Sequence, residues 1–123
     1  MMVMLNGVIS EVTNVKIGDI VGSGRVIEVL HKHMRKGYYI INNELKITND
    51  HPVLVNENWK AAENVIIGDY INNVKVKSVN YVEQLVPTVY IGTDNDSFNV
   101  YCGENVYTVH GHYKQILQIE KAS

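Results

Sequence analysis

The chain contains the stretch Asn14-Val15-Lys16-Ile17-Gly18-Asp19-Ile20-Val21, and fifty positions later it contains Asn64-Val65-Ile66-Ile67-Gly68-Asp69-Tyr70-Ile71. In each copy a Gly-Asp pair follows an apolar run. Glycine can adopt the positive φ that a tight bend needs, and the aspartate can hydrogen-bond neighbouring backbone N–H groups. The repetition continues weakly with Val26 against Val76. Two copies are too few for a solenoid, so we expect two β-units that close on each other as pseudo-twofold halves of one domain.

The residues outside this repeat predict strands as well. Short runs rich in Val, Ile, Tyr and Thr alternate with Gly, Asn and Asp, which tolerate the backbone angles of turns. Helical periodicity is almost absent, and the best exception is 59–64, which we expect to form about one and a half helical turns. We therefore predict an all-β fold with a single domain over 1–123. Its halves should span about 1–58 and 59–111, with an extra C-terminal strand over 112–119.

Composition bounds the class of protein. The chain has 123 residues, of which 46% are hydrophobic and 20% charged, so it can bury a core and need not be disordered. Eleven basic against thirteen acidic side chains give a formal net charge of −2, which argues against a nucleic-acid partner. No apolar run approaches the roughly 20 residues of a membrane span, so we expect no membrane partner. We expect a cytoplasmic or virion-associated protein that is not secreted, and abundant Asn, Ile, Lys and Tyr are compatible with a phage or bacterial origin.

One short segment could carry chemistry: Thr48-Asn49-Asp50-His51-Pro52. Pro52 forces His51 out of the helical region and removes a ladder donor, so the segment should leave the sheet as a turn. Such a turn could aim a hydroxyl and an imidazole at one point, and an imidazole can exchange a proton with a peptide nitrogen near neutral pH. The structural alternative is a turn whose histidine only caps backbone groups.

Other candidates are weaker. His110 ends a strand and pairs with His51 in a second, looser repeat, so both histidines could reach one cleft, although a strand-end histidine can also be purely structural. His31 with His33, and His110 with His112, could each present two rings on one face of a strand, but nothing fixes a third ligand. We therefore predict no metal site and no cofactor.

Two further features of the chain receive structural interpretations. The lone Cys102 excludes an internal disulfide and a four-cysteine zinc site, and a cysteine among apolar neighbours is usually inert. We expect the basic cluster at 31–36 to be a solvated hairpin tip.

Taken in series, several motifs resemble the Hint (hedgehog/intein) family. They are Thr-x-x-His-Pro from Thr48, Trp-Lys-x-Ala from Trp59, the second Gly-Asp, Val89-Tyr90, Phe98-Asn99-Val100 and Val109-His110. The resemblance covers about residues 3–110 in the right order. It implies a flattened all-β horseshoe built from two pseudo-symmetric halves, without the endonuclease insert of larger inteins.

The resemblance also implies functional residues. Active members use an N-terminal Cys or Ser to attack the preceding carbonyl. Thr48 and His51 match the residues that bind and strain the scissile amide, with His51 protonating the departing nitrogen. His110 matches the penultimate histidine, which assists cyclisation of a following asparagine.

This sequence departs from the family at both reacting positions. The nucleophile's place falls before Met1, and the first serine, Ser10, comes too late. Gly111 stands where the asparagine belongs, and it has no side-chain amide. The variant inteins that start from an internal cysteine have it where this chain has Ile91. Covalent catalysis without a nucleophile has no first step.

Three interpretations follow. The first is a Hint-fold module that has lost splicing and acts as a structural or binding module, with Thr48, His51 and His110 vestigial. The second is the autoprocessing domain of a longer polyprotein whose nucleophile lies outside this chain. The third is an unrelated β-domain with metal-dependent chemistry at the His-x-His pairs. Under the first two, the partner is the chain's own flanking polypeptide or another protein. The sequence leaves open whether the chain has enzymatic activity, and it does not fix the oligomeric state.

Overall fold

The structure of the chain is a computed structural model, which describes residues 2–111. These residues are nearly all β, with fourteen strands and two short 3-10 turns. The all-β prediction is confirmed. The strand expected over 112–119, and His112 with it, lie outside the described residues. Within the described range, no helix has the length and apolar character that a membrane crossing requires.

The segment 2–21 and the segment fifty positions later fold into the same succession of elements. The first comprises β1 (Met2–Leu5), β2 (Val8–Glu11), the 3-10 turn η1 (Val12–Asn14) and β3 (Ile20–Val21). The second comprises β7 (Pro52–Val55), β8 (Asn58–Ala61), the 3-10 turn η2 (Ala62–Asn64) and β9 (Tyr70–Ile71). The second succession thus begins at Pro52, and the division of the domain near residue 58 stays a prediction.

The remaining strands connect and complete these two units. They are β4 (Gly24–Arg35), β5 (Tyr38–Ile41), β6 (Leu45–Ile47), β10 (Val74–Lys75), β11 (Val79–Val82), β12 (Val86–Thr93), β13 (Ser97–Cys102) and β14 (Asn105–His110). Strands β11, β5 and β6 form one sheet, and the other eleven strands form a second.

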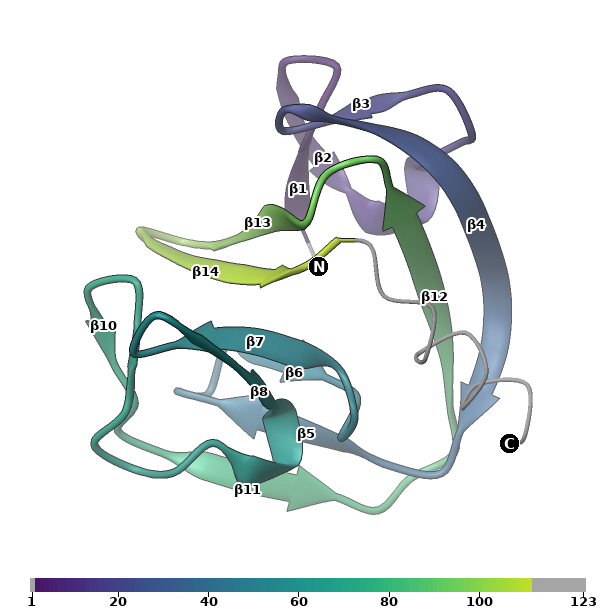
Figure 1. Ribbon diagram of the computed structural model, residues 1–123. Coiled ribbons are helices and arrows are strands. Elements are labelled where there is room, and N and C mark those ends of the chain that lie inside the picture. The colour runs from purple at the N-terminus through teal and green to yellow at the C-terminus, as the bar shows by residue number, and fades with distance from the viewer. Residues whose placement is uncertain (1, 112–123) are drawn as a thin grey trace.

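Two lobes lie on either side of a central hairpin. Strands β13 and β14 pair with each other, while β1 pairs with β13 and β7 pairs with β14. Figure 1 shows β1–β3 in one lobe and β5–β11 in the other, with the antiparallel pair β4 and β12 running along one side from lobe to lobe. Strand β12 lies at the edge of its sheet. Proline has no backbone N–H to donate to a neighbouring strand, so Pro87 is tolerated in an edge strand.

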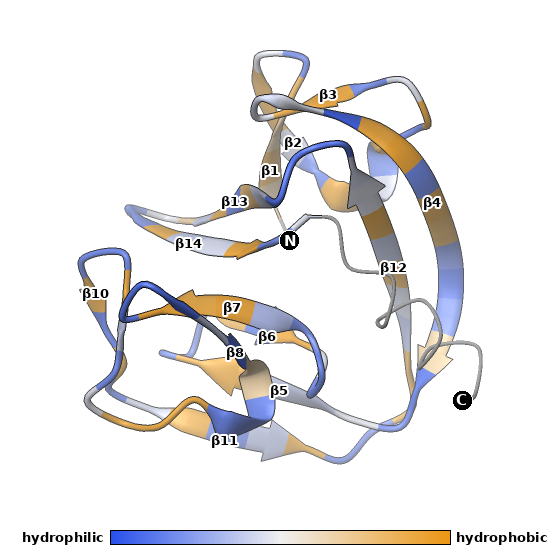
Figure 2. Cartoon of the chain, in the orientation of Figure 1, coloured by the Kyte–Doolittle hydropathy of each residue, from blue (hydrophilic) through white to orange (hydrophobic). Residues whose placement is uncertain are grey.

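Equivalent valines and isoleucines of the two units form the core. Four pairs of side chains fifty positions apart are all 3% exposed or less: Val3 and Val53, Val15 and Val65, Val21 and Ile71, and Val26 and Val76. Figure 2 shows short apolar stretches separated by polar ones along β4, and β12 ends in four buried residues, Tyr90–Thr93. The core therefore has a contribution from each copy of the repeat.

The two Gly-Asp bends are matched in detail. Gly18 has φ +95° and Gly68 has φ +100°, a region that disfavours other residues. The Asp19 carboxylate accepts from the backbone N–H of Lys16 at 2.9 Å, and the Asp69 carboxylate accepts from that of Ile66 at 3.0 Å. The conformation that we predicted for both bends is present.

Two local predictions were wrong. Residues 59–61 lie in strand β8, and the expected helical turn shrinks to the 3-10 turn η2, because the backbone of β8 pairs with β7. The cluster 31–36 is not a hairpin tip, since it falls at the end of the long strand β4 and Arg35 is only 6% exposed. The pairing of β4 with β12 overrides the local abundance of charge.

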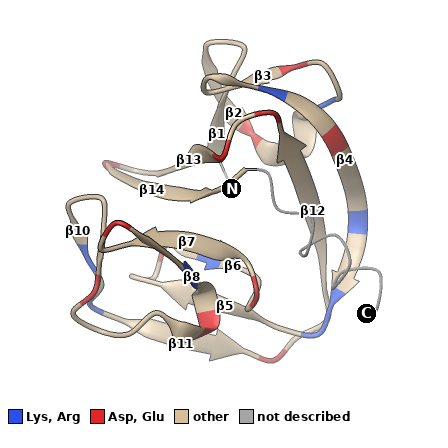
Figure 3. Ribbon diagram, viewed as in Figure 1, with Lys and Arg blue, Asp and Glu red and all other residues tan. Residues whose placement is uncertain are grey.

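Charged residues are distributed over the whole molecule. Figure 3 shows Lys and Arg positions in both lobes, with Asp and Glu positions among them. Neither lobe carries charge of a single sign.

Candidate functional site

The Thr48–His51 segment is a tight turn between β6 and β7. The backbone N–H of His51 donates to the Thr48 carbonyl at 3.2 Å, and Pro52 begins β7, as its lack of a donor predicts. The 3-10 turn η2 packs against this turn: the N–H of Ala62 donates to the His51 carbonyl at 3.0 Å, and the N–H of Glu63 donates to the Asn49 carbonyl at 2.9 Å. The turn is therefore fixed by main-chain bonds at both ends.

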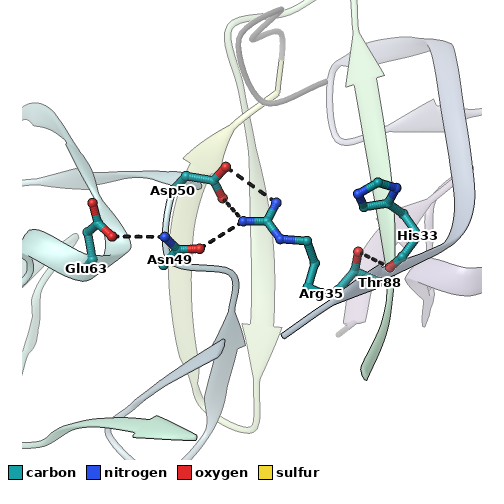
Figure 4. A network of polar contacts seen from close by, with 6 residues as sticks. All are labelled: His33, Arg35, Asn49, Asp50, Glu63 and Thr88. Atoms are coloured by element: carbon teal, nitrogen blue, oxygen red, sulfur yellow. Dashed lines mark hydrogen bonds and ion pairs between the residues drawn. The ribbon is translucent and has the colours of Figure 1, made fainter. Parts of the chain in front are cut away.

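Arg35 holds the same turn from the other side (Figure 4). Its guanidinium donates to Asn49 Oδ1 at 2.9 Å and to the two carboxylate oxygens of Asp50 at 3.1 and 3.4 Å. Asn49 donates in turn to Glu63 Oε2 at 3.0 Å. The side chains of Arg35 and Asp50 are 7% and 12% exposed. The Arg35 guanidinium thus holds the Asp50 carboxylate through two hydrogen bonds in a largely buried pair. Bidentate pairs of this kind are geometrically specific, so this pair fixes the path of the turn.

His51 carries an imidazole whose Nε2 atom is buried and has no hydrogen-bond partner among the described residues. Burial lowers the pKa of His51 from 6.5 to about 4, against the opposing effects of the His110 backbone and the Asp50 charge. The ring is therefore neutral at neutral pH. A buried, unpartnered nitrogen is uncommon in native proteins and calls for a functional explanation.

His110 lies next to His51 at the end of β14. Its backbone interacts with the His51 imidazole, and its own ring lies against the indole of Trp59, with ring centroids 4.5 Å apart and planes tilted by 50°. Thr48, His51 and His110 thus gather at the junction of β6, β7 and β14. His110 lines the Trp59 side of this junction and is not part of the groove described next.

An apolar groove of about 720 Å³ opens beside the turn. Thr48 and His51 lie on its wall together with apolar side chains from η1, β6, β12 and β13. These apolar lining residues are Val12, Ile47, Val86, Val89, Ile91 and Phe98. His31 and the charged side chains of Lys32, Lys46 and Glu11 also line it. An apolar groove with a few polar groups is the usual form of a ligand site.

Gly111 closes the described chain in a tightly packed position. Its N–H donates to the Asp96 carbonyl at 2.8 Å, and its carbonyl accepts from the N–H of Thr93. A Cβ at this position would lie 2.9 Å from Thr93 Oγ1 and 3.1 Å from both the Asn95 carbonyl oxygen and Phe98 Cδ1. Any side chain at this position would require its neighbours to move.

The remaining candidates are separated from this site or altered by the fold. The pairing of β4 with β12 shifts register at His31 and Lys32, and Lys32 has φ +56°, so the alternation that would align His31 with His33 is interrupted. Residues 2–111 hold no group of three or more side chains suited to a metal ion.

Cys102 and Ser10, the residues that we considered as nucleophiles, do not line the groove. Burial together with the nearby Glu44 raises the pKa of the Cys102 thiol. Ser10 lies in β2, where its hydroxyl donates to the Val8 carbonyl at 3.4 Å. Ile91, at the position where variant inteins have a cysteine, is buried in the wall of the groove.

Sequence reasoning missed the residues that support the turn. Arg35 was assigned to a solvated tip and Trp59 to a helical turn, yet one fixes Asn49 and Asp50 and the other contacts His110. The available signal was the acidic Asp50 next to His51, because an aspartate in a buried turn needs a cationic partner.

Solved structures with the same fold are intein splicing domains. The structure is similar to the MchDnaB-1 intein, with a TM-score of 0.71, 15% identity and coverage of 89% of this chain and 95% of that one. It is similar to the zinc-bound splicing domain of the Msm DnaB1 intein, with a TM-score of 0.69, 14% identity and coverage of 89% and 94%. It is also similar to the gp41-1 intein, with a TM-score of 0.64, 19% identity and coverage of 89% of this chain and 92% of that one.

Comparisons of the sequence with family models and with curated proteins found no match. The structural likeness shows the fold: the chain has the Hint fold of intein splicing domains, as its motifs predicted.

Proposed function

We propose that this chain is a Hint-fold module that does not process its own backbone and that binds an extended polypeptide segment in the groove beside Thr48 and His51. The observation that carries the proposal is the packing around Gly111. Asparagine cyclisation needs a side-chain amide at that position, and a Cβ there would lie 2.9 Å from Thr93 Oγ1. Release of the C-terminal flank by this route therefore has neither its reacting group nor space for it.

Support for a binding function comes from the groove itself. Its apolar walls bury side chains of a partner, and the neutral His51 and the hydroxyl of Thr48 are among the polar groups of its lining. A nitrogen without a partner suits a site that receives a peptide N–H, because a neutral imidazole nitrogen accepts such a bond. Thr48, His51 and His110 are, in this proposal, parts of a former reaction site whose binding half is retained.

We also propose that the two matched units arose by internal duplication. The support is the hydrogen bonding of residues fifty positions apart. Asn6 donates to Asp19 at 3.3 Å and Asn56 donates to Asp69 at 3.4 Å, while each asparagine carbonyl accepts from the backbone N–H of Ile20 or Tyr70. Side-chain contacts of this kind are not required by the fold of the backbone alone.

The test is to express the chain with a folded reporter domain fused at each end and follow its intact mass for several days, with and without dithiothreitol. We expect no cleavage at the Gly111 junction or before Met1. The chain with His51→Ala serves as a matched control for background proteolysis. Cleavage that depends on His51 would overturn the proposal.

A second candidate function, autoprocessing within a longer polyprotein, is favoured by the proximity of Thr48, His51 and His110. It is tested with a cysteine placed a few residues before Met1 in the same fusion. Thiol-induced cleavage at that cysteine, lost in His51→Ala, would support autoprocessing. An intact, folded product would favour the binding module.

A further inference from the structure

We propose that the groove is occupied by the chain's own C-terminal segment, residues 112–123, which lies outside the described residues. This inference rests on the proposed function, because it names the polypeptide that the groove binds. Neither the fold nor the comparisons with inteins assign an occupant to the groove.

The first argument is where the described chain ends. Gly111 is bonded through its N–H to Asp96 and through its carbonyl to Thr93, so its backbone is fixed against the β12–β13 connection. Its position lies beside Phe98, since a Cβ on Gly111 would be 3.1 Å from Phe98 Cδ1. Phe98 is also a wall of the groove. The described chain therefore ends at the edge of the groove.

Reach does not limit the occupant. Twelve residues in an extended conformation span about 40 Å at roughly 3.3 Å each. That is about three times the radius of gyration of roughly 14 Å expected for a domain of this length. The segment can therefore follow the groove along its length, starting from Gly111.

The second argument is complementary chemistry. The segment contains Tyr113, Ile116, Leu117 and Ile119. These side chains need burial, because contiguous apolar surface is costly in water. On the groove wall, the exposed Pro87 and the partly exposed Val86 and Val89 give them apolar surface to pack against. Val12 and Phe98 are among the apolar residues that line the groove, so the apolar side chains of the segment and those of the groove can pack against each other in one contact.

Charge agrees with the same placement. The segment carries Lys114 between Tyr113 and Ile116, and Glu120 and Lys121 after its apolar residues. The groove is lined by the cationic Lys32 and Lys46 and by the acidic Glu11. Glu120 thus has cationic partners available in Lys32 and Lys46, and Glu11 is available to one of the two lysines, although exposed pairs of this kind stabilise only weakly.

The experiment uses the full chain with Cys102→Ser and Gln118→Cys, with a nitroxide spin label on residue 118 and methyl-labelled Ile and Val. We expect the methyl signals of Ile47, Ile91 and Val89 to lose most of their intensity next to the label. Ile71, which is buried in β9 and does not line the groove, is the internal control and should keep its intensity. Unchanged Ile47 and Ile91 signals in the labelled chain would overturn the inference.

Two further samples separate the alternatives. A mixture of methyl-labelled chain without nitroxide and spin-labelled chain without methyl labels should show no broadening, and broadening in it would show that a second copy fills the groove instead.

A full chain with Ile116→Asp and Leu117→Asp should bind a synthetic peptide of residues 112–123 at the groove, whereas the unmodified chain should not bind it. If the unmodified chain binds the peptide there, the groove binds polypeptide as proposed but is not occupied by its own segment. If neither chain binds it, both the inference and the binding function fail. Should Gln118→Cys disturb the fold, as the Ile71 signal would report, Lys114→Cys carries the label in its place.

Discussion

His51 makes the pH dependence of stability predictable at the level of one residue. Burial lowers its pKa to about 4 in the folded chain, against the ordinary histidine value of 6.5 that applies once the chain is unfolded. The unfolded chain therefore binds the proton first as the pH falls, so stability present above pH 6.5 is lost progressively towards pH 4. At about 1.4 kcal/mol per pKa unit, the loss amounts to roughly 2 kcal/mol by pH 5.

The measurement is urea unfolding of the chain and of His51→Gln at pH 7 and pH 5. We expect the free energy of unfolding of the unmodified chain to fall more between these values than that of His51→Gln, by roughly 2 kcal/mol. His31→Gln, which makes the same substitution at an exposed histidine, is the matched control. Equal pH dependence of all three chains would show that the His51 ring is solvated.

Arg35 gives a second prediction for single residues. Arg35→Met would leave the Asp50 carboxylate, 12% exposed, without its cation, and removing one partner of a buried pair costs about 3 kcal/mol or more. The charge of Asp50, no longer offset, should also raise the pKa of His51, because it already acts in that direction. Denaturant unfolding and an NMR titration of the His51 ring measure the two effects.

The double variant Arg35→Met with Asp50→Asn tests the cause. It should recover part of the lost stability, since no unpaired charge remains in the turn. If Arg35→Met and the double variant are equally destabilised, then Arg35 acts through packing of its side chain and not through its charge.

At this scale the sequence points to candidate site residues more readily than to the residues that support them. Thr48, His51 and His110 were singled out because a Thr-x-x-His-Pro turn and a strand-end histidine have local signatures, and their chemical role stays a prediction. Arg35 was missed because its burial depends on β4 reaching Asn49 and Asp50, which are distant in sequence. Trp59 was misassigned for the same reason, since the pairing of β8 with β7 is a tertiary contact.

At the scale of elements, the Gly-Asp bends are the clearest predictions that the structure bears out. Both glycines have a strongly positive φ, and no atom beyond their chain neighbours lies within 4 Å of an added Cβ. The cost of substitution should therefore come from backbone strain alone. We expect Gly18→Val and Gly68→Val each to lower the free energy of unfolding by about 1 kcal/mol or more.

Gly18→Asn and Gly68→Asn are the matched variants, because asparagine adopts a positive φ more readily than other non-glycine residues, so each should lose less stability than the valine variant. The chain itself contains such an exchange, with Gly22 at φ +61° and Asn72, its counterpart fifty positions on, at φ +57°. Valine and asparagine variants of equal stability would show that the bends relax to another conformation.

Element boundaries were harder to predict than element types. The strand-rich pattern predicted an all-β chain, yet the 3-10 turn η1 has no sequence signature that separates it from its flanking strands. Strand β7 begins at Pro52, and at Val53 it pairs with Val109 of β14, which lies far along the chain. Periodicity within a segment cannot locate a boundary that a distant strand sets.

At the scale of the whole molecule, the topology predicts one cooperative unit despite the two lobes. The hairpin β13–β14 joins β1 to β7, and the pair β4–β12 runs from one lobe to the other, so neither lobe can unfold without losing strand partners. A domain of this size is also in the range where two-state unfolding is usual. Trp59, the single tryptophan, lies in the second unit and reports on that lobe alone.

We therefore expect Trp59 fluorescence and far-ultraviolet circular dichroism to give coincident urea transitions. Gly18→Val, whose strain lies in the first unit, should shift the fluorescence transition of Trp59 by the same amount as the dichroism transition. Gly68→Val is the matched variant in the second unit and should do likewise. If Gly18→Val moved only the dichroism signal, the first unit would be unfolding by itself, and the hairpin and the β4–β12 pair would be joining two lobes that are each stable alone.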